Sequence, residues 1–346
     1  MRIRLRHILL VGLLTVLIGT AAISATRAAP ADMTLTLAAY SVPREAYGAL
    51  LPLFEQQWLA KTGQKIAFQE SYGGSGAQSR AVIGGLEADV VALSVEPDVT
   101  ALVNANLITH DWKQNDYAGF VTDSVVVFGV RKDNPKKIQD WADLAQPDLE
   151  VLTPDPSTSG GAQWNILAAY GAARRGFVTG YDKSDDGGLK FVGDVFKRVS
   201  VMDKDGRTSF LTFEKGIGDV AINYENELFA SQQAGGDSLM IYPTSSILIE
   251  NPVAVVDSSV DKHGTRAAAE AFVAFLWTPD AQRIFAKYGF RPVEPTVAKD
   301  EAIAKQFPAI KDLFKIDEFG GWKTVSKDLF GKTGKITALI NSVKGQ

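Results

Sequence analysis

The sequence predicts an α/β protein whose sheets are mostly parallel. Short runs of β-branched and apolar residues alternate with segments in which apolar residues recur at helical spacing. The chain has 346 residues, of which 46% are apolar, so it is long enough for two ordinary domains with buried cores. Two strand-rich segments, near residues 118–128 and 245–253, could carry the chain from a first lobe into a second and back.

The first 31 residues have the layout of a secretory signal peptide. Three arginines make a positive start, and the apolar run Ile8–Ile23 and a stretch rich in small residues follow. The apolar run is short for a bilayer span, which favours cleavage near residues 28–31 over an uncleaved anchor helix. The mature chain is therefore expected in the periplasm and not embedded in the membrane.

Charge and cysteine content restrict the function further. Removal of residues 1–31 takes away four arginines and no acid, so the formal net charge changes from −4 to −8. An acidic protein binds nucleic acid poorly, and none is expected as a partner. Because the chain has no cysteine, it has no disulfide, thiolate nucleophile or cysteine-based zinc site.

The first strand and helix are predicted from the segment after the leader. Thr34–Tyr40 reads as a strand, and Ser41 as the N-cap of a helix with Pro43 in its first turn. Pro52 is expected to kink or divide this helix, because proline removes a backbone donor. Gly63 is expected to end it.

Six further strands are predicted from β-branched or apolar runs: Ile66–Ser71, Ala88–Leu93, Ser124–Val130, Val151–Thr153, Asp219–Tyr224 and Ile247–Val256. Pro252 in the last run indicates an edge or crossing segment. Residues from about 265 to 288 and much of the C-terminal third read as helical. We therefore assign residues 32–122 and 247–346 to a first lobe and residues 123–246 to a second.

Three Gly/Ser-rich loops, each after a predicted strand and before a helical pattern, are the candidate site: Ser71–Gly76, Ser157–Ala162 and Asp205–Ser209. The first turn of a helix has N–H groups without intrahelical partners and carries partial positive charge. Glycine allows close approach to the backbone, and serine adds a hydroxyl donor. Taken singly, each loop reads as an ordinary capped helix. Together with Ser41, four helix starts could converge on one anion.

Other signatures have little support. Ala77 stands where a phosphate-binding loop needs lysine, and no dinucleotide motif follows the first strand. A secreted serine hydrolase using Ser75 or Ser159 remains an alternative, but it needs a base. The mature chain has only His110 and His263, both distant in sequence.

No cofactor or metal is expected, because no His/Asp/Glu cluster has ligand spacing. Glu225 and Glu227 lie two apart after a predicted strand. We interpret them as a solvated helix start rather than as paired acids.

Seven stretches carry a resemblance to a known family: AAYSVPRE (38–45), GGSGAQ (73–78), EADVVAL (87–93), VRKDNPKKIQDWADL (130–144), TSGGAQWN (158–165), GIGDVAINYENE (216–227) and FGGW (319–322). Over about residues 34–335 the chain resembles the periplasmic sulfate-binding proteins of ABC importers. The resemblance implies a two-lobed periplasmic binding protein of type II, which closes over a dehydrated dianion in the cleft between the lobes. It also implies a monomer that docks on an ABC permease driven by ATPase subunits.

The resemblance carries specific ligand contacts onto this sequence. They are the N–H groups of Ser41, Ser75, Gly160, Gly161 and Gly206, the hydroxyl of Ser159, and the position of a family indole, which is Tyr224 here. Tyr224 in place of tryptophan and Gly206 in place of alanine leave thiosulfate or a molybdate-type oxyanion open as alternatives to sulfate. Ferric iron has less support, because it needs clustered anionic ligands.

The residue types in the loops favour an unprotonated anion. Sulfate at neutral pH only accepts hydrogen bonds, so a site made only of donors satisfies it. Protonated phosphate in such a site leaves a buried donor unpaired, at a cost of about 1–3 kcal/mol. Asp205 is the carboxylate whose contact with the ligand would contradict this argument, and Arg207 is expected to brace its loop.

Overall fold

The computed structural model describes residues 31–345, so the predicted signal peptide lies almost entirely outside the described residues. The described residues form a mixed α/β fold around one sheet of ten strands. The strands are β1 (Met33–Tyr40), β2 (Ile66–Gly73), β3 (Val90–Ala92), β4 (Phe120–Val130), β5 (Val151–Leu152), β6 (Val199–Val201), β7 (Val220–Tyr224), β8 (Leu239–Ile241), β9 (Ser245–Val255) and β10 (Asp312–Phe314). The α/β prediction is confirmed.

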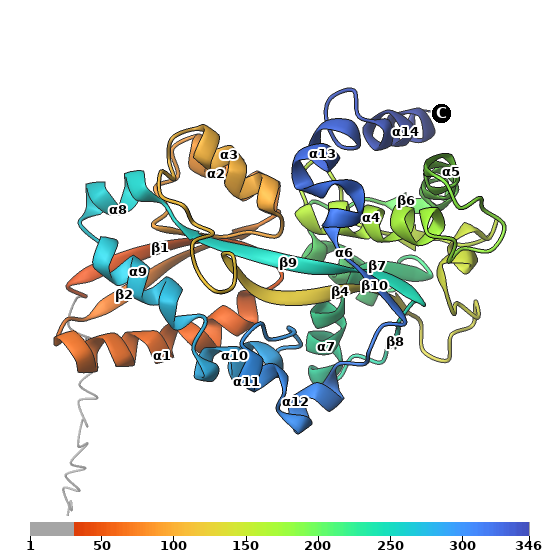
Figure 1. The fold of residues 1–346 in the computed structure, drawn as a ribbon. Helices are drawn as coiled ribbons and strands as arrows, with labels where there is room; N and C mark the ends of the chain where they lie inside the picture. The colour runs from red at the N-terminus through yellow and green to blue at the C-terminus, as the bar shows by residue number, and fades with distance from the viewer. Residues whose placement is uncertain (1–30, 346) are drawn as a thin grey trace, which may run out of the picture. The chain divides into compact units, whose positions relative to one another are not determined.

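Helices pack around the sheet on both sides of the long strands β4 and β9 (Figure 1). They are α1 (Arg44–Thr62), α2 (Ser75–Ile83), α3 (Glu96–Asn104), α4 (Gly160–Arg174), α5 (Asp185–Phe196), α6 (Gly206–Glu214), α7 (Glu225–Gln233), α8 (Asp257–His263), α9 (Arg266–Phe275), α10 (Pro279–Lys287), α11 (Pro295–Ala298), α12 (Glu301–Gln306), α13 (Gly321–Asp328) and α14 (Lys335–Lys344). Two 3₁₀ turns lie at Trp141–Ala145 and Ile316–Phe319. Within residues 31–345, no helix is both long and apolar enough to span a bilayer.

The sheet consists of two parallel groups joined by two long antiparallel strands. Its order is β2-β1-β3-β9-β4-β7-β5-β6, with β10 paired to β9 and β8 to β4. The group β2-β1-β3 is parallel, and so is β7-β5-β6. Between them, β4 and β9 run antiparallel side by side (Figure 1). These two strands overlap the predicted crossing segments 118–128 and 245–253, and the assignment of the two lobes to residue ranges remains a prediction.

Helix α1 differs from its prediction at its start. It begins at Arg44 after Pro43 and has no side-chain cap, so the assignment of Ser41 as its N-cap is wrong. It is also not divided at Pro52, which lies inside the helix, and the alternative of a kink at Pro52 stays a prediction. The helix continues past Pro52 because Pro52 and Gly48, whose carbonyl loses its helical partner, are both exposed, so water can bond to that carbonyl. The predicted end at Gly63 is confirmed, with a left-handed φ of 76°.

The segment predicted as helical near residues 265–288 is two helices. Thr278 caps the second of them through its hydroxyl oxygen, which accepts from the N–H of Ala281 at 3.4 Å. Pro279 occupies the first turn, where its missing N–H costs nothing. The chain therefore turns at this point and packs α9 and α10 separately against α1.

An aromatic cluster joins α1 and α9 to the sheet. The ring of Phe272 lies 5.2 Å from that of Phe54, 4.9 Å from that of Phe68 and 6.5 Å from that of Tyr47, measured between centroids. Phe272, Phe54 and Tyr47 are buried. Such tilted and edge-to-face pairs add to the stabilisation that burial of the rings provides.

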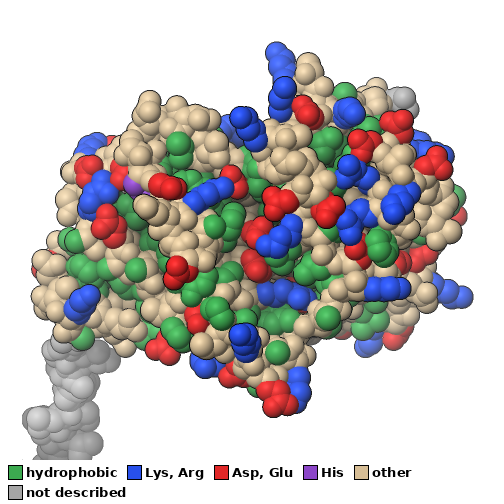
Figure 2. Space-filling view, in the orientation of Figure 1, with side chains coloured by type: hydrophobic (Ala, Val, Ile, Leu, Met, Phe, Trp, Pro, Cys, Tyr) green, Lys and Arg blue, Asp and Glu red, His purple; other side chains and the backbone are tan. Residues whose placement is uncertain are grey.

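Charged side chains of both signs are intermixed over the face of the molecule seen in Figure 2. Lysines and arginines lie beside aspartates and glutamates on this face, so it has no extended patch of one sign. This face therefore has no broad field of one sign that would attract an anion.

The substitution Phe272→Ala is expected to lower the free energy of unfolding by about 3–5 kcal/mol, because it removes a buried ring and leaves a cavity. Urea unfolding followed by circular dichroism measures this loss. The exposed Leu59 on α1 is the matched control, and Leu59→Ala is expected to change stability by less than about 0.5 kcal/mol. Equal losses in both variants would contradict the assignment of this core.

Candidate functional site

The four predicted helix starts all follow parallel strands. Helix α1 follows β1, α2 follows β2, α4 follows β5 and α6 follows β6. Because the carboxyl ends of parallel strands meet at one edge of a sheet, α1 and α2 begin at one edge, and α4 and α6 begin at another. Ligands of α/β proteins bind at such sheet edges. In this chain the edge with the α1 and α2 starts and the edge with the α4 and α6 starts could face each other.

Hydrogen bonds and close contacts link these starts. The hydroxyl of Ser41, before α1, donates to Oδ1 of Asp205, before α6, at 3.0 Å. The N–H of Ala77 in α2 donates to the carbonyl of Thr158, before α4, at 3.3 Å. A Cβ atom added to Gly74 would lie 2.4 Å from this carbonyl oxygen and 2.8 Å from that of Lys204. The structure therefore brings all four starts together, and glycine at position 74 makes the approach possible.

The five backbone N–H groups that the family resemblance assigns to the ligand belong to buried residues and have no hydrogen-bond partner among the described residues. They belong to Ser41, Ser75, Gly160, Gly161 and Gly206, all of which are buried. Within residues 31–345, none of these five N–H groups donates a hydrogen bond to the protein. Leaving a buried N–H unpaired costs about 1–3 kcal/mol, so five together favour an acceptor with several oxygens.

The hydroxyls of Ser159 and Ser75 have different roles. The oxygen of Ser159 accepts from the N–H of Ala162 at 3.4 Å and caps α4, so its hydrogen remains free to donate outward. The hydroxyl of Ser75 donates to Oδ2 of Asp98 at 2.5 Å and accepts from the N–H of Ser94 at 2.9 Å. Ser75 therefore offers a ligand its N–H and not its hydroxyl hydrogen.

Tyr224, the last residue of β7, is buried against the start of α4. A Cβ atom added to Gly161 would lie 2.7 Å from Cε2 of its ring. Its hydroxyl lies 2.5 Å from Oγ of Ser94. One hydrogen of this hydroxyl pair joins the two oxygens, so only one remains for a ligand. Burial raises the pKa of Tyr224 well above its usual value, which keeps the phenol protonated.

Ser94 is a residue of this site that the sequence analysis missed. Its carbonyl accepts from the indole of Trp164 at 2.9 Å and from the amide of Asn251 at 3.1 Å. A Cβ atom added to Gly160 would lie 2.7 Å from its Oγ. The available signal was its position just after the buried β3, at the same sheet edge as the α1 and α2 starts.

Asp205 and Arg207 hold the start of α6. Oδ1 of Asp205 accepts from the N–H of Thr208 at 2.8 Å, so this carboxylate caps its own helix. Arg207 has the bracing position expected for it: its guanidinium pairs with Glu45 of α1 and donates to the carbonyl of Val42 at 3.4 Å. The positive charge of Arg207 is therefore already engaged by the protein.

The interpretation of Glu225 and Glu227 as a solvated helix start is wrong. Their exposed fractions are 0% and 1%. Glu225 binds Arg291 through Nε at 2.7 Å and Nη2 at 2.9 Å and accepts from the hydroxyl of Tyr242 at 2.8 Å. These partners lie 66 and 17 residues away in sequence, which is why local pattern could not reveal the burial.

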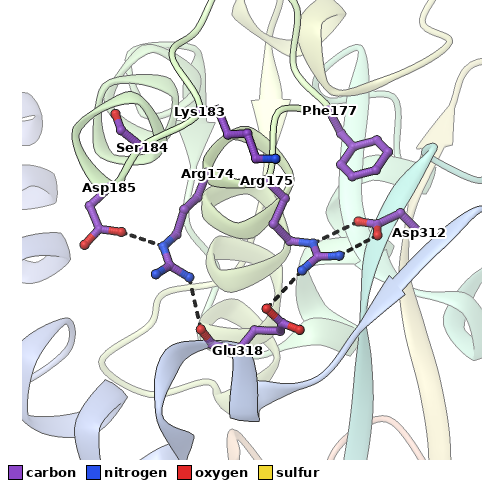
Figure 3. Close-up of a pocket in the computed structure, with 8 residues that line it drawn as sticks. All are labelled: Arg174, Arg175, Phe177, Lys183, Ser184, Asp185, Asp312 and Glu318. Carbon is purple, nitrogen blue, oxygen red and sulfur yellow. Dashed lines mark hydrogen bonds and ion pairs between the residues drawn. The ribbon is translucent and has the colours of Figure 1, made fainter.

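A pocket of about 520 Å³ lies at the other end of α4 (Figure 3). Its arginines have carboxylate partners: Nε of Arg174 lies 2.5 Å from Asp185, and Arg175 contacts Asp312 at 2.6 Å and Glu318 at 3.0 Å. An anion there would have to displace these carboxylates. The unpaired N–H groups at the start of α4 therefore make a better anion site than the two arginines at its end, which are already paired with carboxylates.

Comparisons with known proteins identify the family of this chain. Residues 35–291 match the family model of the bacterial extracellular solute-binding proteins. A sulfate-binding protein of Synechococcus elongatus is 45% identical, over 90% of this chain and 88% of its own length. A thiosulfate-binding protein of Pseudomonas aeruginosa is 38% identical, over 88% of this chain and 91% of its own. The structure of the sulfate-binding protein SubI of Mycobacterium tuberculosis superposes with a TM-score of 0.80 and 40% identity, covering 86% of this chain and 100% of SubI.

The substitution Gly74→Ala is expected to weaken oxyanion binding by roughly tenfold or more, or about 1.4 kcal/mol. Its Cβ would collide with two backbone carbonyls and prevent the loops from meeting. Its φ of −63° and ψ of 139° suit alanine, so unfolding should be little changed. Calorimetric titration measures the affinity. Gly48→Ala, in open space on α1, is the control, and equal affinity in both variants would contradict the role of Gly74.

Proposed function

The chain belongs to the bacterial extracellular solute-binding proteins, and from this membership we propose that it captures sulfate outside the cytoplasmic membrane and delivers it to an ABC importer. One observation carries the proposal. Four buried N–H groups at the starts of α2, α4 and α6, and that of Ser41 between β1 and α1, have no acceptor among the described residues. The sulfate-binding relatives supply the identity of the anion.

The donor set suits a dianion that carries no proton. Backbone N–H groups can only donate, and sulfate oxygens at neutral pH can only accept. The partial positive charge at each helix start stabilises the dianion without a free cation in the site. Seven residues make up the proposed binding set: Ser41, Ser75, Ser159, Gly160, Gly161, Gly206 and Tyr224.

We propose that binding closes two lobes, residues 32–122 with 247–346 and residues 123–246, which bend about β4 and β9. The bond from Ser41 to Asp205 and the contact of Ser94 with Tyr224 both run between these lobes. Sulfate held by donors from both sides would stabilise the closed form, because only that form brings all the donors together.

The cellular setting follows from the same proposal. A signal peptide cleaved near residues 28–31 would export the chain to the periplasm. There it would act as a monomer without a cofactor, and its closed form would dock on a permease coupled to ATPase subunits. It would perform no chemistry on its ligand.

Thiosulfate or a molybdate-type oxyanion is the second candidate for the same site. The observation that favours it is the hydroxyl of Tyr224, which is bonded to Ser94 and so is not a dedicated ligand donor. The similarity to a thiosulfate-binding protein supports this candidate as well.

A serine hydrolase has less support. Ser75 donates to Asp98. His110 binds Asp257, and His263 binds Glu87 and Asp89. Among the described residues, neither histidine contacts Ser75 or Ser159, so no histidine is in place to activate either serine as a nucleophile.

Calorimetric titration of residues 32–346 after dialysis against sulfate-free buffer tests the proposal. We expect one sulfate per chain with a Kd of about 1 μM or tighter, near −8 kcal/mol, and weak binding of phosphate. Firm binding of thiosulfate or molybdate without sulfate would transfer the function to the second candidate. If no oxyanion binds, the helix starts are ordinary caps and the proposal is wrong.

A further inference from the structure

Two acids in the first turn of α7 have opposite surroundings. Glu225 has a hydrogen-bond partner for each carboxylate oxygen, in Arg291 and Tyr242. Glu227 lies two residues further along α7 and is as deeply buried. Neither of its carboxylate oxygens, however, accepts a hydrogen bond from the described residues. Nε of Arg207 lies 3.2 Å from Oε2 of Glu227 but is not aligned for a hydrogen bond. A buried carboxylate without donors is poorly stabilised in its charged form.

The groups around Glu227 are mostly acidic. Asp205 and Arg207 face it from the start of α6 and Glu214 from the same helix, Glu45 faces it from α1, and the phenols of Tyr40 and Tyr224 face it from β1 and β7. Arg207 is the one cation in this group, and Glu45 shares it. A dianion at the N–H of Gly206, the residue before Arg207, would add two more negative charges.

We infer that Glu227 is a further positioning residue of the oxyanion site, and that it takes up a proton when the oxyanion binds. The inference rests on the proposed function, since it assigns a second role within the same site. The proton comes from solvent and adds to a carboxylate oxygen of Glu227, and no other bond forms or breaks. Once Glu227 is neutral, it no longer competes for the charge of Arg207. Arg207 then pairs with Glu45 and donates to the carbonyl of Val42, two contacts that join the start of α6 to the start of α1.

The sign of the pH dependence follows from burial. Burial raises the pKa of Glu227 from 4.5 to about 8, more than the neighbouring Arg207 lowers it. In an opened form with water at this position, the pKa would lie closer to its usual value. At pH values between the pKa of Glu227 in the opened form and its pKa in the closed form, closing over an anion therefore takes up a proton. In that range the affinity for the anion falls as the pH rises, by up to about tenfold per pH unit.

Two other acids, Asp98 and Asp123, are partly buried and have raised pKa values, so their proton uptake has to be separated from that of Glu227. Burial raises the pKa of Asp98, which accepts from Ser75, to about 6. Burial also raises the pKa of Asp123 on β4 to about 7, but this group faces Glu250, Lys315 and Arg291. Only the part of the proton uptake that disappears on substitution of Glu227 belongs to the inference.

Sulfate titrations between pH 7 and pH 9, in chloride-salt buffers of Tris, imidazole and triethanolamine, test it. Because these buffers differ in protonation enthalpy, the variation of the binding heat with buffer gives the number of protons taken up. We expect uptake in the wild-type chain that is lost in Glu227→Gln, together with a flatter dependence of Kd on pH. Glu225→Gln, an equally buried acid two residues away, is expected to keep the wild-type uptake.

Three outcomes overturn the inference or the proposal beneath it, each in its own way. Sulfate binding without proton uptake in the wild-type chain, or uptake that persists in Glu227→Gln, overturns the inference and leaves the proposed function standing. No sulfate binding by the wild-type chain overturns the proposed function itself. Should Glu227→Gln fail to fold, infrared difference spectra of the wild-type chain decide, because sulfate must then increase the carbonyl band of a protonated carboxyl.

Discussion

The unpaired backbone N–H groups at the helix starts are the constraint around which the rest of the site is arranged. Four of the five belong to helices that follow parallel strands, and the fifth, that of Ser41, lies between β1 and α1, so the sheet order decides where they lie. Two parallel groups of strands, joined by β4 and β9, bring two pairs of helix starts to one place. The side chains around them cap helices, brace loops or pack against the backbone.

Close approach of backbone requires glycine at several of these positions. Gly74 faces the carbonyls of Thr158 and Lys204, and Gly160 and Gly161 face Ser94 and Tyr224 at distances that a Cβ atom would violate. None of these three glycines has a positive φ, so the constraint is space and not backbone conformation. A site in which backbone groups bind the ligand therefore still depends on residue identity, because only glycine leaves enough space at these positions.

Among the described residues, the site offers an anion no arginine that is free of a carboxylate partner. The arginine beside the α6 start is shared with Glu45 and lies close to Glu227, and the arginines at the end of α4 have carboxylate partners. What remains for an anion is the partial charge of aligned peptide groups, which burial makes stronger than it is in water. Such a site recognises how many hydrogen bonds an anion accepts as well as its charge.

Sequence alone predicted the features that local pattern encodes. The α/β class, most strands, the three Gly/Ser loops and the helices that follow them came from periodicity and residue type, and the resemblance supplied the site residues. It missed Ser94 and the burial of Glu225 and Glu227. Each of these depends on tertiary partners or on which face of a helix meets solvent. The hydroxyl pair of Ser94 and Tyr224 joins residues 130 apart, a contact that no local pattern encodes.

The most direct test of the helix-start site is a sulfate titration of ¹⁵N-labelled protein followed by the amide resonances. The site described here predicts that the largest downfield proton shifts belong to Ser41, Ser75, Gly160, Gly161 and Gly206, because these N–H groups would donate to the anion. Unchanged amides at these positions, with the largest changes around Arg174 and Arg175 instead, would contradict it.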